Sequence, residues 1–200
     1  MDKPVPQDAP PLLIVISGPS GVGKDSVLDG MRRLPRPWHF IVTATTRPRR
    51  ANERDGLAHV FMEPSEFQAL LEQDGFLEHA EVYGRHYGVP RAQAEEGLSS
   101  GKDVIVRTDL QGARTLRAKV PGAILVFLAP PDMAELERRL RDRKSETADD
   151  LARRIEAAAL EMQCQSEFDY VVVNHSGRLD ETIVAIEEAI ATEKRKRSGG

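Results

Sequence analysis

The fold of this chain is decided by the stretch Leu12-Leu13-Ile14-Val15-Ile16-Ser17-Gly18-Pro19-Ser20-Gly21-Val22-Gly23-Lys24-Asp25-Ser26. Its five consecutive apolar residues do not alternate with polar ones, which predicts a strand buried on both faces, as in the centre of a parallel sheet. The spacing from Gly18 to Gly23 and Lys24 is that of a loop whose backbone N–H groups surround phosphate oxygens. The helix predicted to follow points its positive end at the same place. We therefore expect a nucleotide phosphate site here.

One position departs from the usual phosphate-loop pattern. That pattern has Ser or Thr after the lysine, as a Mg²⁺ ligand. This chain has Asp25 there and offers a hydroxyl only at Ser26. Asp25 and Ser26 are therefore the candidate metal ligands, and the whole segment from Gly18 to Ser26 is the candidate nucleotide-binding segment.

Composition and charge limit the classes of function. The chain has 200 residues and a formal net charge of −4, which gives no general attraction to nucleic acid. Its apolar runs are all far shorter than the roughly 20 residues of a membrane span. The N-terminus lacks the pattern of a signal peptide, and the single cysteine, Cys164, is expected to be inert. We expect a cytoplasmic protein without a nucleic-acid or membrane partner.

Strand and helix patterns alternate along most of the chain, which predicts an α/β fold with a doubly wound, mostly parallel five-stranded sheet. The expected strands after the first are 39–43, 104–106, 123–129 and 170–173, and the expected helices after the loop helix are 64–73, 91–99, 111–119, 132–141, 149–167 and 179–194. The region 43–90 interrupts the alternation and is the candidate inserted subdomain. Residues 1–11 are expected to be an extended lead-in, and residues 191–200 a frayed basic tail.

Phosphoryl transfer needs a second site for the acceptor and cations at the transferring phosphate. Two sets of arginines could supply them, because the planar guanidinium binds phosphate through two hydrogen bonds. The first set is Arg47 and Arg50, and the second is Arg139, Arg143 and Arg154. From spacing alone, two solvated charged faces remain an equal alternative.

Beyond the phosphate loop, several segments resemble guanylate kinases, in the same order and along nearly the whole chain from about residue 12 to residue 174. They are Thr45-Thr46-Arg47 with Arg50, Asp55-Gly56, Phe76-Leu77-Glu78-His79-Ala80, Tyr87-Gly88, Gly101 to Ile105, Asp109 to Ala113, Leu136 to Arg143 and Phe168 to Asn174. The resemblance implies the phosphate-loop nucleoside monophosphate kinase fold and phosphorylation of GMP, and also of dGMP, by ATP and Mg²⁺. It implies one domain over 12–190, made of a core (12–42 and 91–190), a GMP-binding subdomain (about 43–90) and a helical lid (about 139–155). The protein would act in purine nucleotide metabolism as a monomer or homodimer.

Residue roles are implied by the same resemblance. Positions Arg47, Arg50 and Tyr87 match those that bind the GMP phosphate, and Thr43, Glu78 and Asp109 match those that recognise guanine, with Thr43 in place of the usual serine. Lys24 and the loop backbone would hold the ATP phosphates, Arg139, Arg143 and Arg154 match lid and transfer arginines, and Asn174 matches an adenine-side position. A carboxylate can accept hydrogen bonds from N1–H and the 2-amino group of guanine together, and adenine does not offer that pair of donors.

Four positions depart from the family pattern. Asp25 replaces the metal-binding hydroxyl, Arg107 replaces an aspartate, Val89 replaces a hydroxyl residue and His59 replaces a phosphate-binding tyrosine. Asp25 either serves the metal, with Arg107 balancing its charge, or pairs with Arg107 and leaves the metal to Ser26 or water. A bacterial and organellar branch of the family is similar at Asp25, Arg107 and Val89. His59 could still donate a hydrogen bond to the substrate phosphate, or have no role in binding.

Two other functions fit parts of the sequence. Asp25, His59 and Val89 also resemble ribose 1,5-bisphosphate phosphokinase, but Glu78 and Asp109 argue against that acceptor. A protein-binding module that has lost catalysis is the second alternative. Lys24 and the full set of lid arginines argue against this alternative, because a protein-binding module requires neither.

Overall fold

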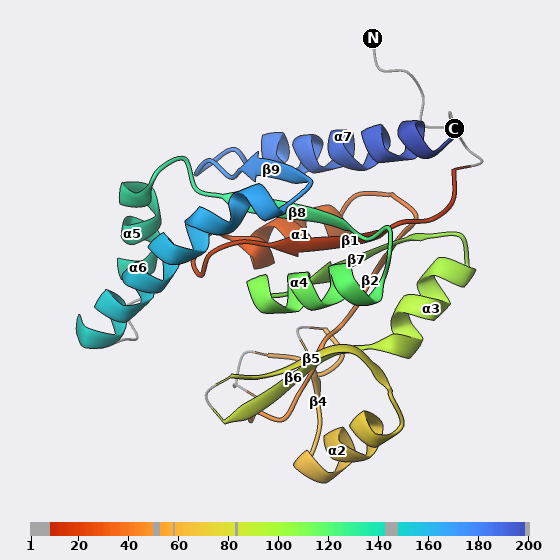
Figure 1. Ribbon diagram of the computed structural model, residues 1–200. Coiled ribbons are helices and arrows are strands. Elements are labelled where there is room, and N and C mark those ends of the chain that lie inside the picture. The colour runs from red at the N-terminus through yellow and green to blue at the C-terminus, as the bar shows by residue number, and fades with distance from the viewer. Residues whose placement is uncertain (1–8, 50–52, 58, 83, 143–147, 199–200) are drawn as a thin grey trace. The chain divides into compact units, whose positions relative to one another are not determined.

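The computed structural model describes residues 9–49, 53–57, 59–82, 84–142 and 148–198 (Figure 1). Arg50 and Arg143, two of the predicted phosphate-binding residues, lie outside these ranges. The elements in chain order are β1 (Leu13–Ser17), α1 (Lys24–Arg32), β2 (Trp38–Phe40), β3 (Ala44–Thr45), β4 (Val60–Phe61), α2 (Pro64–Glu72), β5 (Phe76–Val82), β6 (Arg85–Pro90), α3 (Arg91–Ser99), β7 (Asp103–Arg107), α4 (Leu110–Lys119), β8 (Ile124–Ala129), α5 (Met133–Arg141), α6 (Ala148–Met162), the 3₁₀ helix η1 (Gln163–Glu167), β9 (Tyr170–Val173) and α7 (Leu179–Ser198).

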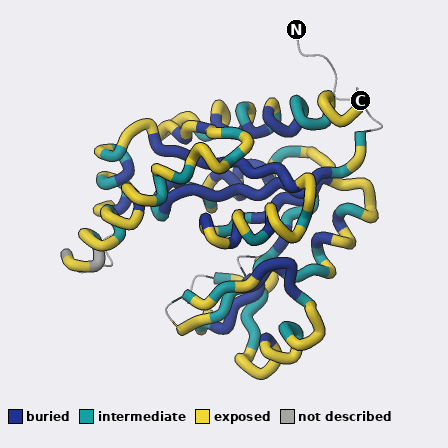
Figure 2. The backbone as a smooth tube through the Cα atoms, in the orientation of Figure 1, coloured by how far each residue is buried: buried dark blue, intermediate teal, exposed yellow. Residues whose placement is uncertain are grey.

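The larger sheet has five strands in the order β2-β7-β1-β8-β9. Its β2·β7 and β8·β9 pairs are parallel, which confirms the predicted fold class. Every residue of β1 and β8 is buried, as unbroken apolar sequence requires of strands covered on both faces (Figure 2). The order places β1, and therefore the loop that follows it, at the middle of the sheet.

The smaller sheet has the order β4-β3-β6-β5 and lies within the predicted inserted segment. Strands β5 and β6 form an antiparallel pair, and β3 continues the sheet antiparallel to β6. Helix α2 lies beside this sheet in Figure 1, and its Phe67 stacks on Phe76 of β5 with ring centroids 4.4 Å apart. This second core is small: its buried members are Ala44, Phe67 and Phe76, with Met62, Leu70 and Leu71 packed against them.

Contacts between Cα atoms divide the chain into two compact units. Unit 1 contains Met1–Pro10, Ile16–Arg36 and Ile124–Gly200, and unit 2 contains Pro11–Val15 and Pro37–Ala123. The division runs through β1 and assigns β2, α3, β7 and α4 to the same unit as the small sheet. It therefore differs from the predicted division into a core and a 43–90 subdomain, which counted those elements as core.

Most predicted elements are present within a few residues of their predicted bounds, with two notable differences. The second predicted strand, 39–43, ends at Phe40, and the chain then enters the smaller sheet at Ala44. The expected frayed tail is helical through Ser198, because α7 continues past residue 190. Tyr170 of β9 donates a 2.6 Å hydrogen bond to Glu193 of α7, and Lys196 also bonds Glu193, so side chains anchor this last part of the helix.

Candidate active site

The phosphate loop joins β1 to α1 and requires glycine at two positions. Gly18 has φ +140°, and a Cβ there would lie 2.2 Å from the carbonyl oxygen of Leu128. Gly23 has φ +99°, and its Cβ would lie 2.6 Å from Nδ2 of Asn174. Both positions combine a backbone conformation that disfavours L side chains with a close neighbour. The glycines predicted from spacing therefore have a direct structural reason.

Lys24 crosses the loop from the first turn of α1. Its Nζ donates to the carbonyl oxygens of Gly18, at 2.5 Å, and of Pro19, at 3.1 Å. The first turn of α1 has no side-chain cap hydrogen bond, and Gly23 occupies the N-cap position. An anion at this end would meet the lysine and the positive end of the helix together. The geometry fits the predicted role of binding phosphate.

A cavity of about 310 Å³ lies against this loop in unit 1. It is lined by Gly21, Gly23, Ser26, Arg139, Asn174, His175, Ser176, Gly177 and Leu179. Its volume is near the lower end of the range for small-molecule sites. The structure thus brings the predicted adenine-side Asn174 and one predicted arginine, Arg139, to the same cavity as the loop.

Arg139 and Asn174 tie the loop to α5 and to the end of β9. Arg139 donates to the carbonyl oxygens of Val22, at 3.1 Å, and of Asn174, at 2.8 Å. The Asn174 Nδ2 also donates to Val22, at 2.8 Å, and Thr182 donates to its Oδ1. The side chains of Arg139 and Asn174 therefore hold the loop backbone beside the cavity.

Glu135, on the same helix as Arg139, collects three donors. Hydrogen bonds from Arg138, Ser176 and Arg139 lower the pKa of this carboxyl to about 2. Arg139 contributes through Nε at 2.9 Å. Glu135 remains ionised at neutral pH and fixes the orientation of the Arg139 guanidinium.

The remaining loop residues have mixed surroundings. Asp25 and Ser26 are exposed in the first turn of α1. The Ser20 N–H donates to Glu161 of α6 at 3.2 Å, and Arg154 lies on the same helix.

Among the described residues, no group of three or more His, Cys, Asp or Glu side chains could hold a metal by itself. Mg²⁺ bound to phosphates commonly uses only one or two protein oxygens, so Asp25 and Ser26 fit such an ion.

Unit 2 brings together the residues predicted to recognise guanine. Glu78 of β5 is buried, and Asp109 is the N-cap of α4, accepting from the Gly112 N–H at 2.7 Å. Burial raises the pKa of Glu78 to about 7; the charge of Asp109 acts in the same direction and Lys119 opposes it. A Cβ on Gly112 would lie 3.1 Å from Cδ of Glu78, so glycine allows α4 to approach this carboxyl.

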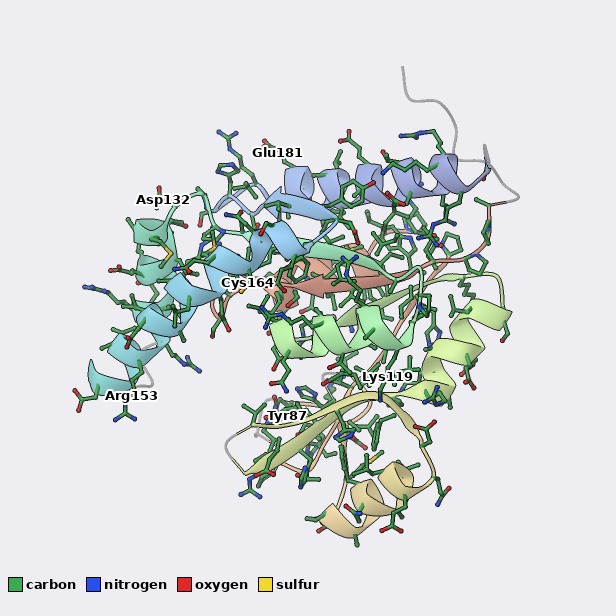
Figure 3. The ribbon with its side chains drawn as sticks, viewed as in Figure 1. Tyr87, Lys119, Asp132, Arg153, Cys164 and Glu181 are labelled. Atoms are coloured by element: carbon green, nitrogen blue, oxygen red, sulfur yellow. The ribbon has the colours of Figure 1, made fainter. Side chains whose placement is uncertain are left out.

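Thr43 and Tyr87 lie in the same unit, and His59 links to both. The Thr43 hydroxyl and Nδ1 of His59 are 2.9 Å apart, and the His59 ring meets that of Tyr87 edge-on at 5.9 Å. Tyr87, labelled in Figure 3, comes from β6. His59 is buried, which makes a solvated surface histidine a poor description of this residue.

Arg47 follows β3 and forms a two-point ion pair that the sequence did not indicate. Its Nη1 and Nη2 donate to the two carboxylate oxygens of Glu53, at 2.7 and 2.5 Å. Its guanidinium also lies 5.3 Å from the centre of the Phe61 ring. The side chains of Arg47 and Glu53 are only 13% and 15% exposed, so this is not a solvated charge pair.

Sequence reasoning missed other residues that support the site. Gln93 of α3 pairs with both backbone groups of Val42, accepting at 2.8 Å and donating at 3.1 Å, and so fixes the residue before Thr43. Glu161, which accepts from the Ser20 N–H, is a second case. Neither belongs to a motif, because each partner lies far away in the sequence. Only the folded chain brings such pairs together.

The described part of the chain also bears on membrane crossing and on the surroundings of the cysteine. None of its helices is both long and apolar enough to cross a bilayer. Cys164 is half-buried in η1, and its thiol donates to the Leu160 carbonyl at 3.8 Å. These observations add no further chemistry to the site.

A phosphate loop at the middle of a parallel sheet, with the lysine of the loop motif in place, is typical of the class of phosphate-loop kinases. Comparisons with known proteins narrow this class. The family described as guanylate kinase matches residues 11–193. A guanylate kinase of Alkalilimnicola ehrlichii is 42% identical over 94% of this chain and 91% of its own length. Guanylate kinase 2 of Oryza sativa, chloroplastic/mitochondrial, is 40% identical over 97% of this chain and 68% of its own length.

A solved structure gives the same result. The crystal structure of guanylate kinase from Anaplasma phagocytophilum superposes with a TM-score of 0.74 at 29% identity, covering 94% of this chain and 88% of that chain. The chain belongs to the guanylate kinase family. It is an enzyme that transfers a phosphoryl group from ATP to GMP and forms GDP. The predicted family, fold class and activity are confirmed.

Proposed function

We propose that the chain divides this reaction between two sets of residues, with ATP bound by the loop in unit 1 and GMP bound by the side chains of unit 2. The observation that carries the proposal is the buried carboxylate of Glu78 beside the N-cap Asp109. An ionised carboxylate accepts two hydrogen bonds side by side, which matches N1–H and the 2-amino group of guanine. Adenine lacks this donor pair, so the same site would leave a buried charge unpaired and reject AMP.

The phosphate of GMP would be bound by Arg47 and Tyr87, with Arg50 as a further cation. Thr43 would contribute its hydroxyl to guanine, and His59 would orient that hydroxyl through the 2.9 Å contact. This support for His59 favours a role in the site over the alternative of no role. The proposed contacts address only the base and the phosphate of GMP, and none addresses the 2′-hydroxyl. We therefore expect dGMP to be accepted as well.

On the ATP side, the Gly18–Lys24 backbone and Lys24 would bind the phosphates, and the cavity beside Asn174 would take the rest of the nucleotide. Arg139 is bonded to the loop backbone, which favours a role in shaping this cavity over one at the transferring phosphate. Arg143 and Arg154 remain the proposed cations at transfer. The oxygens of Asp25 and Ser26 would hold Mg²⁺, which when bound neutralises phosphate charge.

The chemical step would depend on position and charge rather than on a covalent intermediate. Glu78 and Asp109 orient the guanine, Arg47 and Tyr87 fix the accepting phosphate, and Lys24 and the loop hold the phosphoryl donor. Cations at the transferring group stabilise the charge that spreads over its oxygens. This division of roles is sufficient for in-line phosphoryl transfer.

The experiment that tests these roles is an acceptor panel. ADP formation from ATP and Mg²⁺ is measured with GMP, dGMP, AMP, UMP and ribose 1,5-bisphosphate, for the wild type and for Glu78→Gln. We expect turnover with GMP and dGMP alone, and a loss of kcat/KM of about 10² to 10³ in the variant, because a buried charged hydrogen bond is removed. Equal activity of the variant would contradict the role of Glu78.

The panel also tests the two alternative functions. Turnover with ribose 1,5-bisphosphate would favour the sugar phosphokinase, and silence with every acceptor in a folded protein would favour a binding module. Cytoplasmic location and a monomeric or homodimeric state remain predictions, of which the second can be measured by light scattering.

A further inference from the structure

The guanidinium of Arg47 uses one end of its planar fork within the protein. Nη1 donates to the Pro48 carbonyl at 2.9 Å and to Glu53 at 2.7 Å, and Nη2 donates to Glu53 at 2.5 Å. Arginine has five N–H donors. These three bonds do not use the Nε donor and one Nη2 donor, which lie along the side edge of the fork, and Tyr87 is a further hydrogen-bonding neighbour of this guanidinium. Such an edge is suited to two parallel hydrogen bonds with a phosphate.

The same guanidinium is held in orientation by its surroundings. Phe61 covers one face at 5.3 Å, and the low exposure of both charged side chains limits screening by solvent. The hydrogen bond from Arg47 to Glu53 raises the pKa of Arg47; burial opposes this rise, and Tyr87 acts in the same direction as Glu53. Arg47 therefore has a fixed orientation before any substrate is bound, and Tyr87 lies close enough to affect its charge.

We propose that Glu53 is a positioning residue for GMP phosphate binding, because it fixes Arg47 with the Nε and Nη2 edge presented to the substrate. The proposal rests on the role of Arg47 proposed above. A free arginine loses rotamer entropy when it binds an anion, and a pre-oriented one has already lost it. Glu53 thus increases the affinity for the phosphate without touching it.

A contrary interpretation makes Glu53 an internal anion that occupies the phosphate position and must leave. The two interpretations predict opposite signs. Removal of a positioning residue weakens GMP binding, whereas removal of a competing anion strengthens it. The bonds to Glu53 use the end of the fork and not its side edge, which favours the first.

The test is calorimetric binding of GMP and of guanosine to wild type and Glu53→Gln, with KM for GMP and for ATP measured in parallel. We expect the variant to bind GMP about tenfold more weakly, since one charge-assisted interaction is lost. Guanosine affinity and KM for ATP should stay within twofold. Glu95→Gln, an exposed carboxylate in the same unit, is the matched control.

Other outcomes are also decisive. Unchanged or tighter GMP binding by Glu53→Gln would overturn the proposal, and so would an equal loss of guanosine affinity, which indicates general damage to the unit. The variant Arg47→Lys tests the role of Arg47 separately from that of Glu53, because lysine cannot form the two-point contact with a phosphate. If that variant binds GMP normally, the proposed role of Arg47 is wrong. If it binds weakly while Glu53→Gln binds normally, only the role of Glu53 is wrong.

Discussion

Glu78 shows how burial sets the chemistry of a single residue. A carboxyl with an ordinary pKa of 4.5 titrates at about 7 in this site, because burial and the nearby Asp109 disfavour its charge. The unfolded chain therefore loses this proton at lower pH than the folded chain does. The stability associated with protonated Glu78 is fully present below about pH 4.5 and is lost as pH rises through about 7. Ionised Glu78 therefore destabilises the folded chain above about pH 7.

The pH dependence of substrate binding follows from this pKa. If guanine is bound by ionised Glu78, KM for GMP should rise about tenfold between pH 8 and pH 6, as the carboxyl of about pKa 7 becomes protonated. The phosphate of GMP titrates in the same range. Glu78→Gln shares that titration and serves as the control, and its KM should change less over the same interval. A parallel rise in both proteins would contradict the assignment.

The backbone around Gly18 leaves no room for a side chain at this position. Gly18→Ala should disrupt the loop, because the added Cβ would lie 2.2 Å from the Leu128 carbonyl oxygen, in a backbone that cannot yield easily. We expect a loss of ADP binding and a lower Tm. Gly101→Ala is the control, since Gly101 also has positive φ, +73°, but has nothing within 4 Å of the added Cβ. It should cost only the backbone strain of about 1–2 kcal/mol. A Gly18→Ala enzyme that bound ADP normally would refute the steric argument.

At the scale of elements, the amount that could be predicted depended on whether a signal is local. Strand β1 and helix α3 were predictable because an apolar run marks the strand and Gly101 marks the end of the helix, and both signals lie in adjacent residues. Strand β2 was predicted too long, because the chain leaves one sheet at Phe40 and enters another at Ala44 without a turn signal. The pairing of Arg47 with Glu53 depends on a loop conformation that no pattern specifies. The phosphate loop and its glycines were therefore predictable from a local motif, whereas partners that lie elsewhere in the chain, such as Glu53 for Arg47, were not.

Helix α5 presents two adjacent arginines with different surroundings, which makes a matched pair of variants. Arg139 is 14% exposed and holds Val22 and Asn174, whereas Arg138 is 56% exposed and bonds mainly to neighbours on its own helix. We expect Arg139→Ala to lower Tm by about 4–8 °C and to raise KM for ATP at least tenfold. Arg138→Ala should change both only slightly. Equal effects in the two variants, measured by calorimetry and steady-state kinetics, would count against the role of Arg139.

For the whole molecule, the two units predict separate responses to the two ligands. A ligand present at 100 times its Kd stabilises the folded protein that binds it by about 2.7 kcal/mol. This added stability slows hydrogen exchange near the binding site. GMP alone should slow hydrogen exchange in β3, β5 and β6, whereas ADP alone should slow it in the Gly18–Lys24 loop and at β9. Mass spectrometry of exchanged peptides measures both patterns. Protection of the loop by GMP alone, with no change in β5 and β6, would contradict the division of the sites.

The order of the units along the chain has a consequence for synthesis. After its Ile16–Arg36 segment, unit 1 resumes only at Ile124, so all of Pro37–Ala123 is made in between. At about 5–20 residues per second, the ribosome needs roughly 4 to 17 seconds for that interval. During this time Leu128, which lies against Gly18, does not yet exist, whereas unit 2 receives its last residue at Ala123. A nascent chain paused there has every residue of unit 2 but lacks Arg139 and Asn174, which line the cavity beside the phosphate loop.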